Sequence, residues 1–76
     1  MWNHRVLAHK VQGQKEIYLE IHEVYYDDNN KPNGYTKDPV SVGGSDKKEI
    51  IWALNRMLES VDKPILWADE KFPAVY

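Results

Sequence analysis

Three histidines and a scatter of carboxylates are the residues of this chain that could do chemistry, and all three histidines lie in its first third. If the first two apolar segments pair as a hairpin, His4 lies opposite Glu23 and Arg5 lies opposite His22. A general acid–base pair needs such proximity. Catalysis also needs a cleft and a group that stabilises developing charge, and no motif in the sequence supplies either. We therefore predict no catalytic residue, and a small hydrolase or nuclease using His4, His22 or Glu23 is the enzymatic alternative.

The histidines are not arranged as metal ligands in the sequence. His4, His9 and His22 are at no known ligand spacing, and the absence of cysteine excludes a thiolate zinc site. His9 and His22 share a face of the predicted hairpin but should lie several residues apart along it. We therefore expect neither a metal nor a cofactor.

Composition narrows the class of protein further. The 76 residues include ten basic and twelve acidic side chains, scattered in both signs, with a net charge of -2. Nucleic-acid binders usually carry a basic stripe, and this chain has none, so we expect no nucleic-acid partner. No apolar run follows Met1, so we expect neither a signal peptide nor a membrane segment. A chain without cysteine fits the reducing cytoplasm, the compartment that we expect.

The elements that position these side chains begin with a hairpin. In the segment from Glu16 to Tyr26 apolar and polar residues alternate, which is typical of a strand with one buried and one solvated face. A turn through Gly13 pairs it with the segment from Trp2 to Val11. The register that places the aliphatic residues beside apolar or small partners sets Val6 opposite Ile21, Ala8 opposite Leu19 and Trp2 opposite Tyr25.

A third strand and one helix are predicted to complete the fold. The strand runs from Tyr35 to about Val42 and lies at an edge because it contains Pro39. The helix is capped by Ser45 or Asp46, with Glu49 at the capping-box spacing, and ends near Asp62. Its predicted buried stripe comprises Ile50, Leu54, Met57, Leu58 and Val61.

These elements predict a single α+β domain over residues 1–76, a three-stranded antiparallel meander with one helix on one face. The covered face should comprise Val6, Ala8, Ile17, Leu19, Ile21, Val40 and Val42. Residues 65–76 should be irregular, yet they contain three aromatic residues, so we expect part of them to pack back on the domain or on another chain.

One helix can cover only one face of such a sheet, so the other face should be open. That face would comprise Arg5, Leu7, His9, Val11, Tyr18, Glu20, His22, Val24 and Tyr26. Tyr and Arg are enriched where proteins bind proteins. We therefore predict a non-enzymatic interaction module that binds a protein partner or a second copy through Arg5, His9, Tyr18, Glu20, His22 and Tyr26. The alternative is an ordinary solvated outer face with tyrosines that favour strands.

Trp52 is a second candidate for partner binding, because it points away from the predicted buried stripe of the helix. An indole left in water there would be a hot spot for a partner. Alternatively, residues 65–76 fold back and cover it, and the sequence does not distinguish these two possibilities.

Several short motifs resemble known families. The residues Trp2 to Val6, His22 to Asp27, Asp38 to Val40 and Asp62 to Pro64 look like the pattern of a family of small uncharacterised bacterial proteins, over residues 2–66. The resemblance implies a compact bacterial protein and brings no catalytic residue with it. The stretch from Asp38 to Leu58 resembles the ββα core of HicB-like antitoxin domains. This likeness implies a regulatory protein with a toxin partner, although the chain lacks a recognisable DNA-binding extension.

Overall fold

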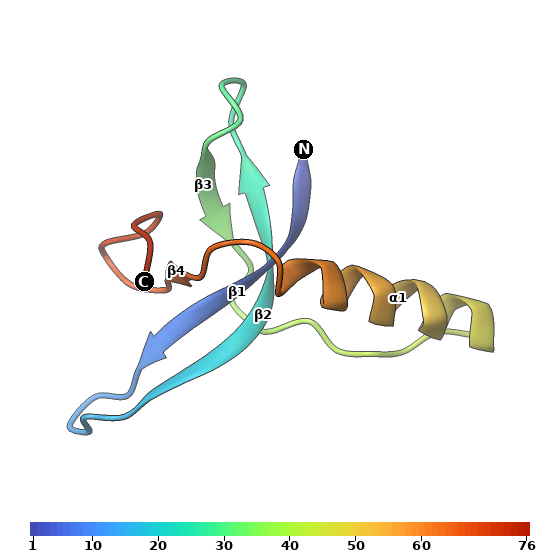
Figure 1. Ribbon diagram of the computed structural model, residues 1–76, viewed down its shortest axis with the longest axis horizontal. Helices are drawn as coiled ribbons and strands as arrows, with labels where there is room; N and C mark the ends of the chain where they lie inside the picture. The colour runs from blue at the N-terminus through green and yellow to red at the C-terminus, as the bar shows by residue number, and fades with distance from the viewer.

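The computed structural model describes residues 1–76 and contains one helix and a curled, mixed, four-stranded sheet (Figure 1). The elements are β1 (Trp2–Lys10), β2 (Ile17–Tyr26), β3 (Pro32–Tyr35), α1 (Lys47–Ser60) and β4 (Leu66–Trp67). The strand order is β3-β2-β1-β4, with β4 parallel to β1 and the other pairs antiparallel. The predicted α+β class is therefore confirmed, whereas the three-stranded meander is wrong because the C-terminal segment adds a fourth strand.

The predicted register of the first hairpin is confirmed. The Cα partners are Val6 with Ile21, Ala8 with Leu19, Trp2 with Tyr25, His4 with Glu23, and Arg5 with His22. Because side chains alternate between the two faces of a sheet, a slip of one residue would turn every one of them to the other face. The turns agree with this register, since Gly13 and Asn30 adopt the left-handed backbone conformation, with φ of 81° and 59°.

The third strand lies earlier in the chain than expected. It covers Pro32–Tyr35, and the chain after it follows β2 only intermittently. Val40 lies against Ile21, and its N–H donates to the Ile21 carbonyl at 2.8 Å. A continuous ladder cannot form there because Pro39 has no N–H to donate.

Helix α1 begins at the predicted cap. The Asp46 carboxylate accepts a hydrogen bond from the Glu49 N–H at 2.9 Å, and the Glu49 carboxylate accepts from the Ser45 N–H and hydroxyl. These bonds satisfy N–H groups that a helix start leaves without partners. The helix ends at Ser60, four residues before Pro64. It is too short and too polar to cross a bilayer.

The sheet has two sides that are covered in different ways. We call one the helix side, formed by the even-numbered residues of β1 and the odd-numbered residues of β2, and the other the tail side, formed by the remaining residues of these strands. The buried cluster lies on the tail side and consists of Leu7, Val24 and Leu66. Partly buried Tyr26, Tyr35, Ala68 and Phe72 pack against it.

Residues 65–76, the tail, cover the side that was expected to be open. Strand β4 places Leu66 beside Leu7, and Phe72 packs on Tyr35 with ring centroids 4.8 Å apart. Arg5 fixes the approach to the tail, since its guanidinium donates to the Pro64 carbonyl at 2.8 Å. The tail is therefore a structural part of the sheet and is not irregular throughout.

The helix side is covered less completely than predicted. Of the residues expected in its core, Val6 and Ala8 are buried, whereas Leu19 is 51% exposed and Val42 is also exposed. Figure 1 shows that α1 projects from the sheet with its C-terminal end nearest to it. The flank of α1 that contacts the sheet carries Ile50, Ala53, Met57 and buried Ser60. The predicted burial of Leu54, Leu58 and Val61 is therefore wrong.

Candidate functional site

The residues predicted to bind a partner do not share one surface. Arg5 and His22 are buried, with His22 fully inaccessible, and Tyr26 is half-buried. The expectation of an open face is therefore wrong at its centre, because the tail occupies it. Tyr18 is exposed at the far end of the hairpin, where its ring stacks on that of His9.

The buried Arg5 has a structural role that its sequence position does not reveal. Besides its bond to Pro64, it donates to the Tyr26 hydroxyl at 2.8 Å, while its Nε is buried without a hydrogen-bond partner. Through these bonds the guanidinium of Arg5 in β1 contacts β2 and the segment between α1 and β4. It is therefore not available to an outside partner.

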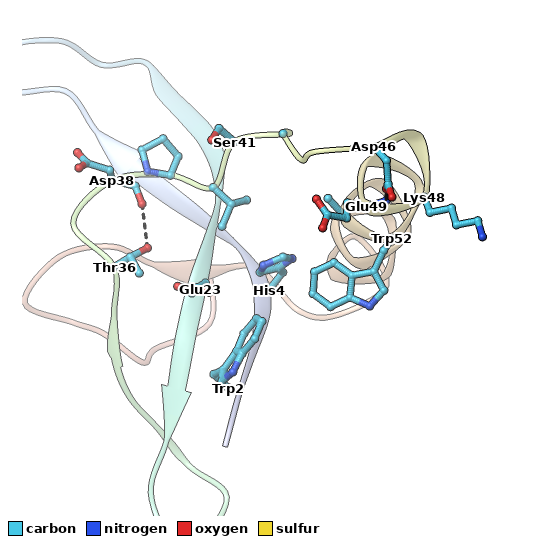
Figure 2. A pocket seen from close by; sticks show the side chains of 14 residues that line it. Trp2, His4, Glu23, Thr36, Asp38, Ser41, Asp46, Lys48, Glu49 and Trp52 are labelled. Atoms are coloured by element: carbon cyan, nitrogen blue, oxygen red, sulfur yellow. Dashed lines mark hydrogen bonds between the residues drawn. The ribbon is translucent and has the colours of Figure 1, made fainter.

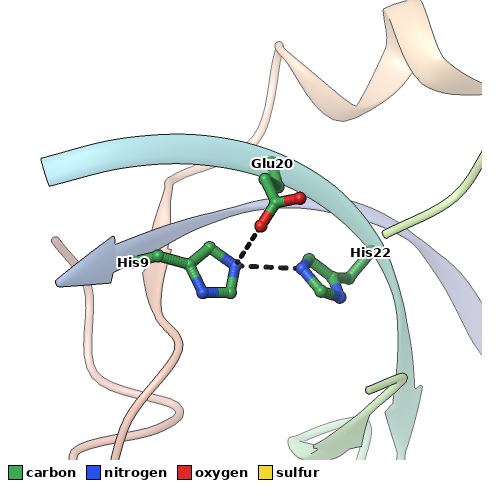
Figure 3. Close-up of side chains that lie close together, drawn as sticks. All are labelled: His9, Glu20 and His22. Atoms are coloured by element: carbon green, nitrogen blue, oxygen red, sulfur yellow. Dashed lines mark hydrogen bonds and ion pairs between the residues drawn. The ribbon is translucent and has the colours of Figure 1, made fainter. Parts of the chain in front are cut away.

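His9, Glu20 and His22 form a compact cluster on the tail side (Figure 3). The Nε2 atoms of His9 and His22 are 2.9 Å apart, and His9 Nε2 is 3.4 Å from a Glu20 carboxylate oxygen. One ligand atom from each of the three residues lies within 4.8 Å of the others. On its other nitrogen, Nδ1, His22 donates to the Thr36 carbonyl at 2.9 Å. This bond orients the ring and directs Nε2 towards the cluster.

The expectation that His9 and His22 lie apart is wrong because the hairpin is strongly curled. The strand partner of His22 is Arg5, four positions from His9 along β1. In Figure 3, β2 bends around the cluster, so that side chains on its concave side converge. Twist and coiling of this kind are common in two-stranded ribbons, but their extent cannot be predicted from the sequence.

The electrostatics of the cluster favour the neutral form of His9. Burial, and then the neighbouring His22, lower the pKa of His9, while the Glu20 carboxylate acts in the opposite direction. The cluster thus combines two imidazoles with one carboxylate in a partly sheltered position. These are donor types that divalent transition metals accept.

A pocket of about 760 Å³ lies between α1 and the helix side of the sheet (Figure 2). Trp2, His4 and Glu23 stand on the sheet wall, and Glu49 and Trp52 stand on the helix wall. The enzymatic alternative required a histidine and a glutamate inside a concave pocket. His4 and Glu23 meet that condition, whereas the third residue of that hypothesis, His22, lies on the other side of the sheet.

The structure shows that residues 65–76 do not cover Trp52. Its side chain is 52% exposed, and the tail does not cover it because the tail packs on the opposite side of the sheet. The Arg56 guanidinium lies over the indole, 5.2 Å from the ring centroid.

Two titratable groups of the pocket are shifted from their ordinary behaviour. Burial lowers the pKa of His4, with Glu23 opposing and Arg56 adding to the shift, and His4 Nδ1 is buried without a hydrogen-bond partner. Hydrogen bonds from the Ser45 backbone and hydroxyl lower the pKa of Glu49. The pocket therefore holds a neutral imidazole beside carboxylates near neutral pH.

A second, apolar groove of about 570 Å³ runs along the other flank of α1. It is lined mainly by Val6, Leu19, Ile21, Pro39, Val40, Met57, Val61 and Ile65. The sequence pattern does not predict this groove, because it places the helix directly over these aliphatic residues. The sequence also gives no sign of the role of Thr36, which acts through its backbone carbonyl.

The function of this chain is inferred from the geometry described above. The chain matches no protein-family model, and no curated protein or solved structure is significantly similar to it.

Proposed function

We propose that the protein is a non-enzymatic protein-interaction module whose contact surface is the apolar flank of α1 with its adjoining groove, and that a second copy of the chain occupies it. The observation that carries the proposal is a continuous apolar surface on the helix side. This surface differs from the one expected from the sequence, because the tail covers the centre of that one.

The helix contributes a regular stripe to this surface. Ile51, Leu54, Leu58 and Val61 are all at least half exposed, and Leu58 is 69% exposed. Their successive spacings of three, four and three residues are those of a coiled-coil seam. Such a seam stabilises a protein only when another helix packs against it, and isolated soluble proteins rarely expose so many large apolar side chains together.

The groove continues this stripe onto the sheet. Met57 and Val61 form its helix wall, and half-exposed Leu19 lies on its sheet wall. A helix laid alongside α1 would cover both the stripe and the groove. This arrangement is the helix-in-groove mode of protein recognition.

The helix dipole favours a second copy in the antiparallel orientation. Each end of α1 carries charges of both signs, Lys47 and Lys48 with Asp46 and Glu49 at its start, and Glu59 and Asp62 with Arg56 and Lys63 at its end. An antiparallel pair of these helices would oppose the two helix dipoles and would bring no large charge of one sign together. A two-fold arrangement of one self-complementary patch is the commonest form of homodimer.

The substitution Leu58→Glu tests this proposal. Two copies of Leu58 would be buried in the dimer, and their loss should weaken it by roughly 2–4 kcal/mol, or about 100-fold in the dissociation constant. Sedimentation equilibrium over a range of concentrations measures this constant. Because Leu58 is mostly exposed and Glu is a comparable helix former, the monomer should keep its fold, which circular dichroism checks.

Gln14→Glu is the control, since it adds the same charge in the exposed turn between β1 and β2. It should leave the dissociation constant unchanged. A wild-type chain that stays monomeric at high concentration, or a Leu58→Glu variant that dimerises as well as the control, contradicts the proposal.

A second candidate function is hydrolysis in the pocket that contains His4 and Glu23. The specific observation in its favour is that both residues line one concave space and that His4 is held neutral, as a general base must be. Hydrolysis of a model ester that is lost in His4→Gln would support it. Wild-type protein without such activity favours the interaction module.

A further inference from the structure

We propose that His9, Glu20 and His22 form a binding site for a divalent transition-metal ion, with the two imidazole Nε2 atoms and a Glu20 carboxylate oxygen as ligands. The two histidines lie on the tail side of the sheet, and Glu20 also reaches the edge of the apolar groove. The metal site does not require the proposed dimer, because all three ligands belong to one chain.

The distances between the donor atoms already approach those of a metal site. Two ligand atoms bound to Zn²⁺ at about 2.0–2.1 Å in tetrahedral geometry lie about 3.3 Å from one another. The separation between the two Nε2 atoms is 2.9 Å, and that between His9 Nε2 and the Glu20 oxygen is 3.4 Å. The third pair, His22 Nε2 and the Glu20 oxygen, lies within 4.8 Å, and changes in the side-chain torsions of Glu20 and His9 would bring the three atoms around one ion.

The second observation is the hydrogen bond behind His22. Metal-binding histidines commonly donate their other ring nitrogen to a carbonyl or carboxylate, which fixes the tautomer and the ring orientation. His22 donates from Nδ1 to the Thr36 carbonyl, and so the lone pair of Nε2 points into the cluster. The ring is also fully buried and meets Tyr35 edge-on, with centroids 5.8 Å apart.

Without a metal, one of the two facing Nε2 atoms must carry a proton to hydrogen-bond to the other. His22 has its proton on Nδ1, so His9 is the donor in that state. To bind a metal, His9 places its proton on Nδ1 instead, a change of tautomer that leaves its charge unchanged. The ion then replaces the shared hydrogen bond and joins β1 to β2.

The donor set also indicates which ions fit. Two imidazoles and one carboxylate suit Zn²⁺, Co²⁺, Ni²⁺ or Cu²⁺, whereas Mg²⁺ and Ca²⁺ prefer oxygen ligands. Three protein ligands leave a fourth tetrahedral position for water. The His9 and Glu20 side chains are 18% and 27% exposed, which leaves a path for the ion and for that water.

Isothermal titration of the untagged full chain with Zn²⁺ tests the site, with Mg²⁺ as the negative control. We expect one Zn²⁺ per chain in the wild type and no heat from Mg²⁺. His9→Gln should weaken Zn²⁺ binding by about 100-fold or more, since loss of groups that only orient ligands already costs about 10–100-fold. Both His9 and Glu20 are partly exposed, so Glu20→Gln provides a second variant should His9→Gln fail to fold.

The chain offers a matched control on the opposite side of the same two strands. His4 and Glu23 are also a cross-strand histidine and glutamate, and they are absent from the cluster. His4→Gln and Glu23→Gln should leave the affinity for Zn²⁺ within about two-fold of the wild type. Visible absorption of bound Co²⁺ provides an independent readout of nitrogen ligands in a tetrahedral site. Wild-type protein that binds no Zn²⁺ at millimolar concentration, or equal losses in His4→Gln and His9→Gln, would overturn the assignment.

Discussion

The two sides of the central hairpin differ in what covers them. On the tail side, a short segment without a helix seals Leu7 and Val24 completely through Leu66 and half-buried Phe72. On the helix side, a fourteen-residue helix leaves Leu19 half exposed. The tail therefore buries its side of the sheet more completely than α1 buries the other side. The reason is that the tail adds a strand to the sheet, whereas α1 contacts the sheet along one narrow flank.

The curvature of the hairpin explains why its two sides are packed differently. The curled hairpin draws the tail-side residues together, which produces both the core and the cluster of His9, Glu20 and His22. The same curvature moves helix-side residues away from a straight helix. The space that results becomes the pocket around His4 and the apolar groove beside Met57.

Two leucine substitutions in the hairpin should lower the free energy of unfolding by very different amounts. Leu7→Ala should lower the free energy of unfolding by about 2–5 kcal/mol, because it leaves a cavity in the core. Leu19→Ala should cost about 1 kcal/mol or less in dilute, monomeric protein, since half of this side chain is already in water. Urea unfolding followed by tryptophan fluorescence measures both values.

A domain of this size has only about 5 kcal/mol of stability to lose, so Leu7→Ala can unfold the chain. The milder change Leu7→Val, expected to cost about 1 kcal/mol, then keeps the comparison measurable. Equal losses at positions 7 and 19 would contradict the assignment of the core to the tail side.

Removal of the helix cap should have a smaller effect. Asp46→Ala deletes the acceptor of the Glu49 N–H and should cost about 1 kcal/mol of helix stability. Because the capped end of α1 projects from the sheet, this loss should appear as fraying of the first turn (Figure 1). Hydrogen exchange should therefore quicken at the start of α1 and stay unchanged at Leu7 and Val24. Faster exchange at both places would show that the two sides are coupled.

The smallest predicted effect is a dependence of stability on pH through His4. Its pKa in the folded chain lies below the ordinary value of 6.5, chiefly because of burial, so the unfolded state binds more protons near and below that pH. The free energy of unfolding should fall as the pH is lowered through 6.5, and His4→Gln should reduce this slope. Urea unfolding at several pH values measures it. A slope that rises in the variant would mean that the attraction of Glu23 outweighs burial and the repulsion of Arg56.

Much of the local structure could be predicted from the sequence. The alternation along β2, together with the turn at Gly13 and the apolar residues of β1, sets the register of the hairpin, and Asp46 with Glu49 marks the start of α1. The candidate metal cluster could not be predicted. His9 lies four positions along β1 from the strand partner of His22, so the two side chains meet only because the hairpin is curved. The orientation of His22 also depends on the backbone carbonyl of Thr36.

The amino-acid sequence by itself determined the two strands of the first hairpin and the helix, which partners face one another in that hairpin, and where the helix is capped. These properties depend on side-chain periods of two and 3.6 residues and on hydrogen bonds between residues a few positions apart. Short stretches of sequence are therefore enough to determine them. Only the tertiary structure decided which side of the sheet became the core. The tail and α1 pack on opposite sides of the same strands, and which side closes completely depends on chain connection, sheet curvature and contacts such as that between Arg5 and Pro64.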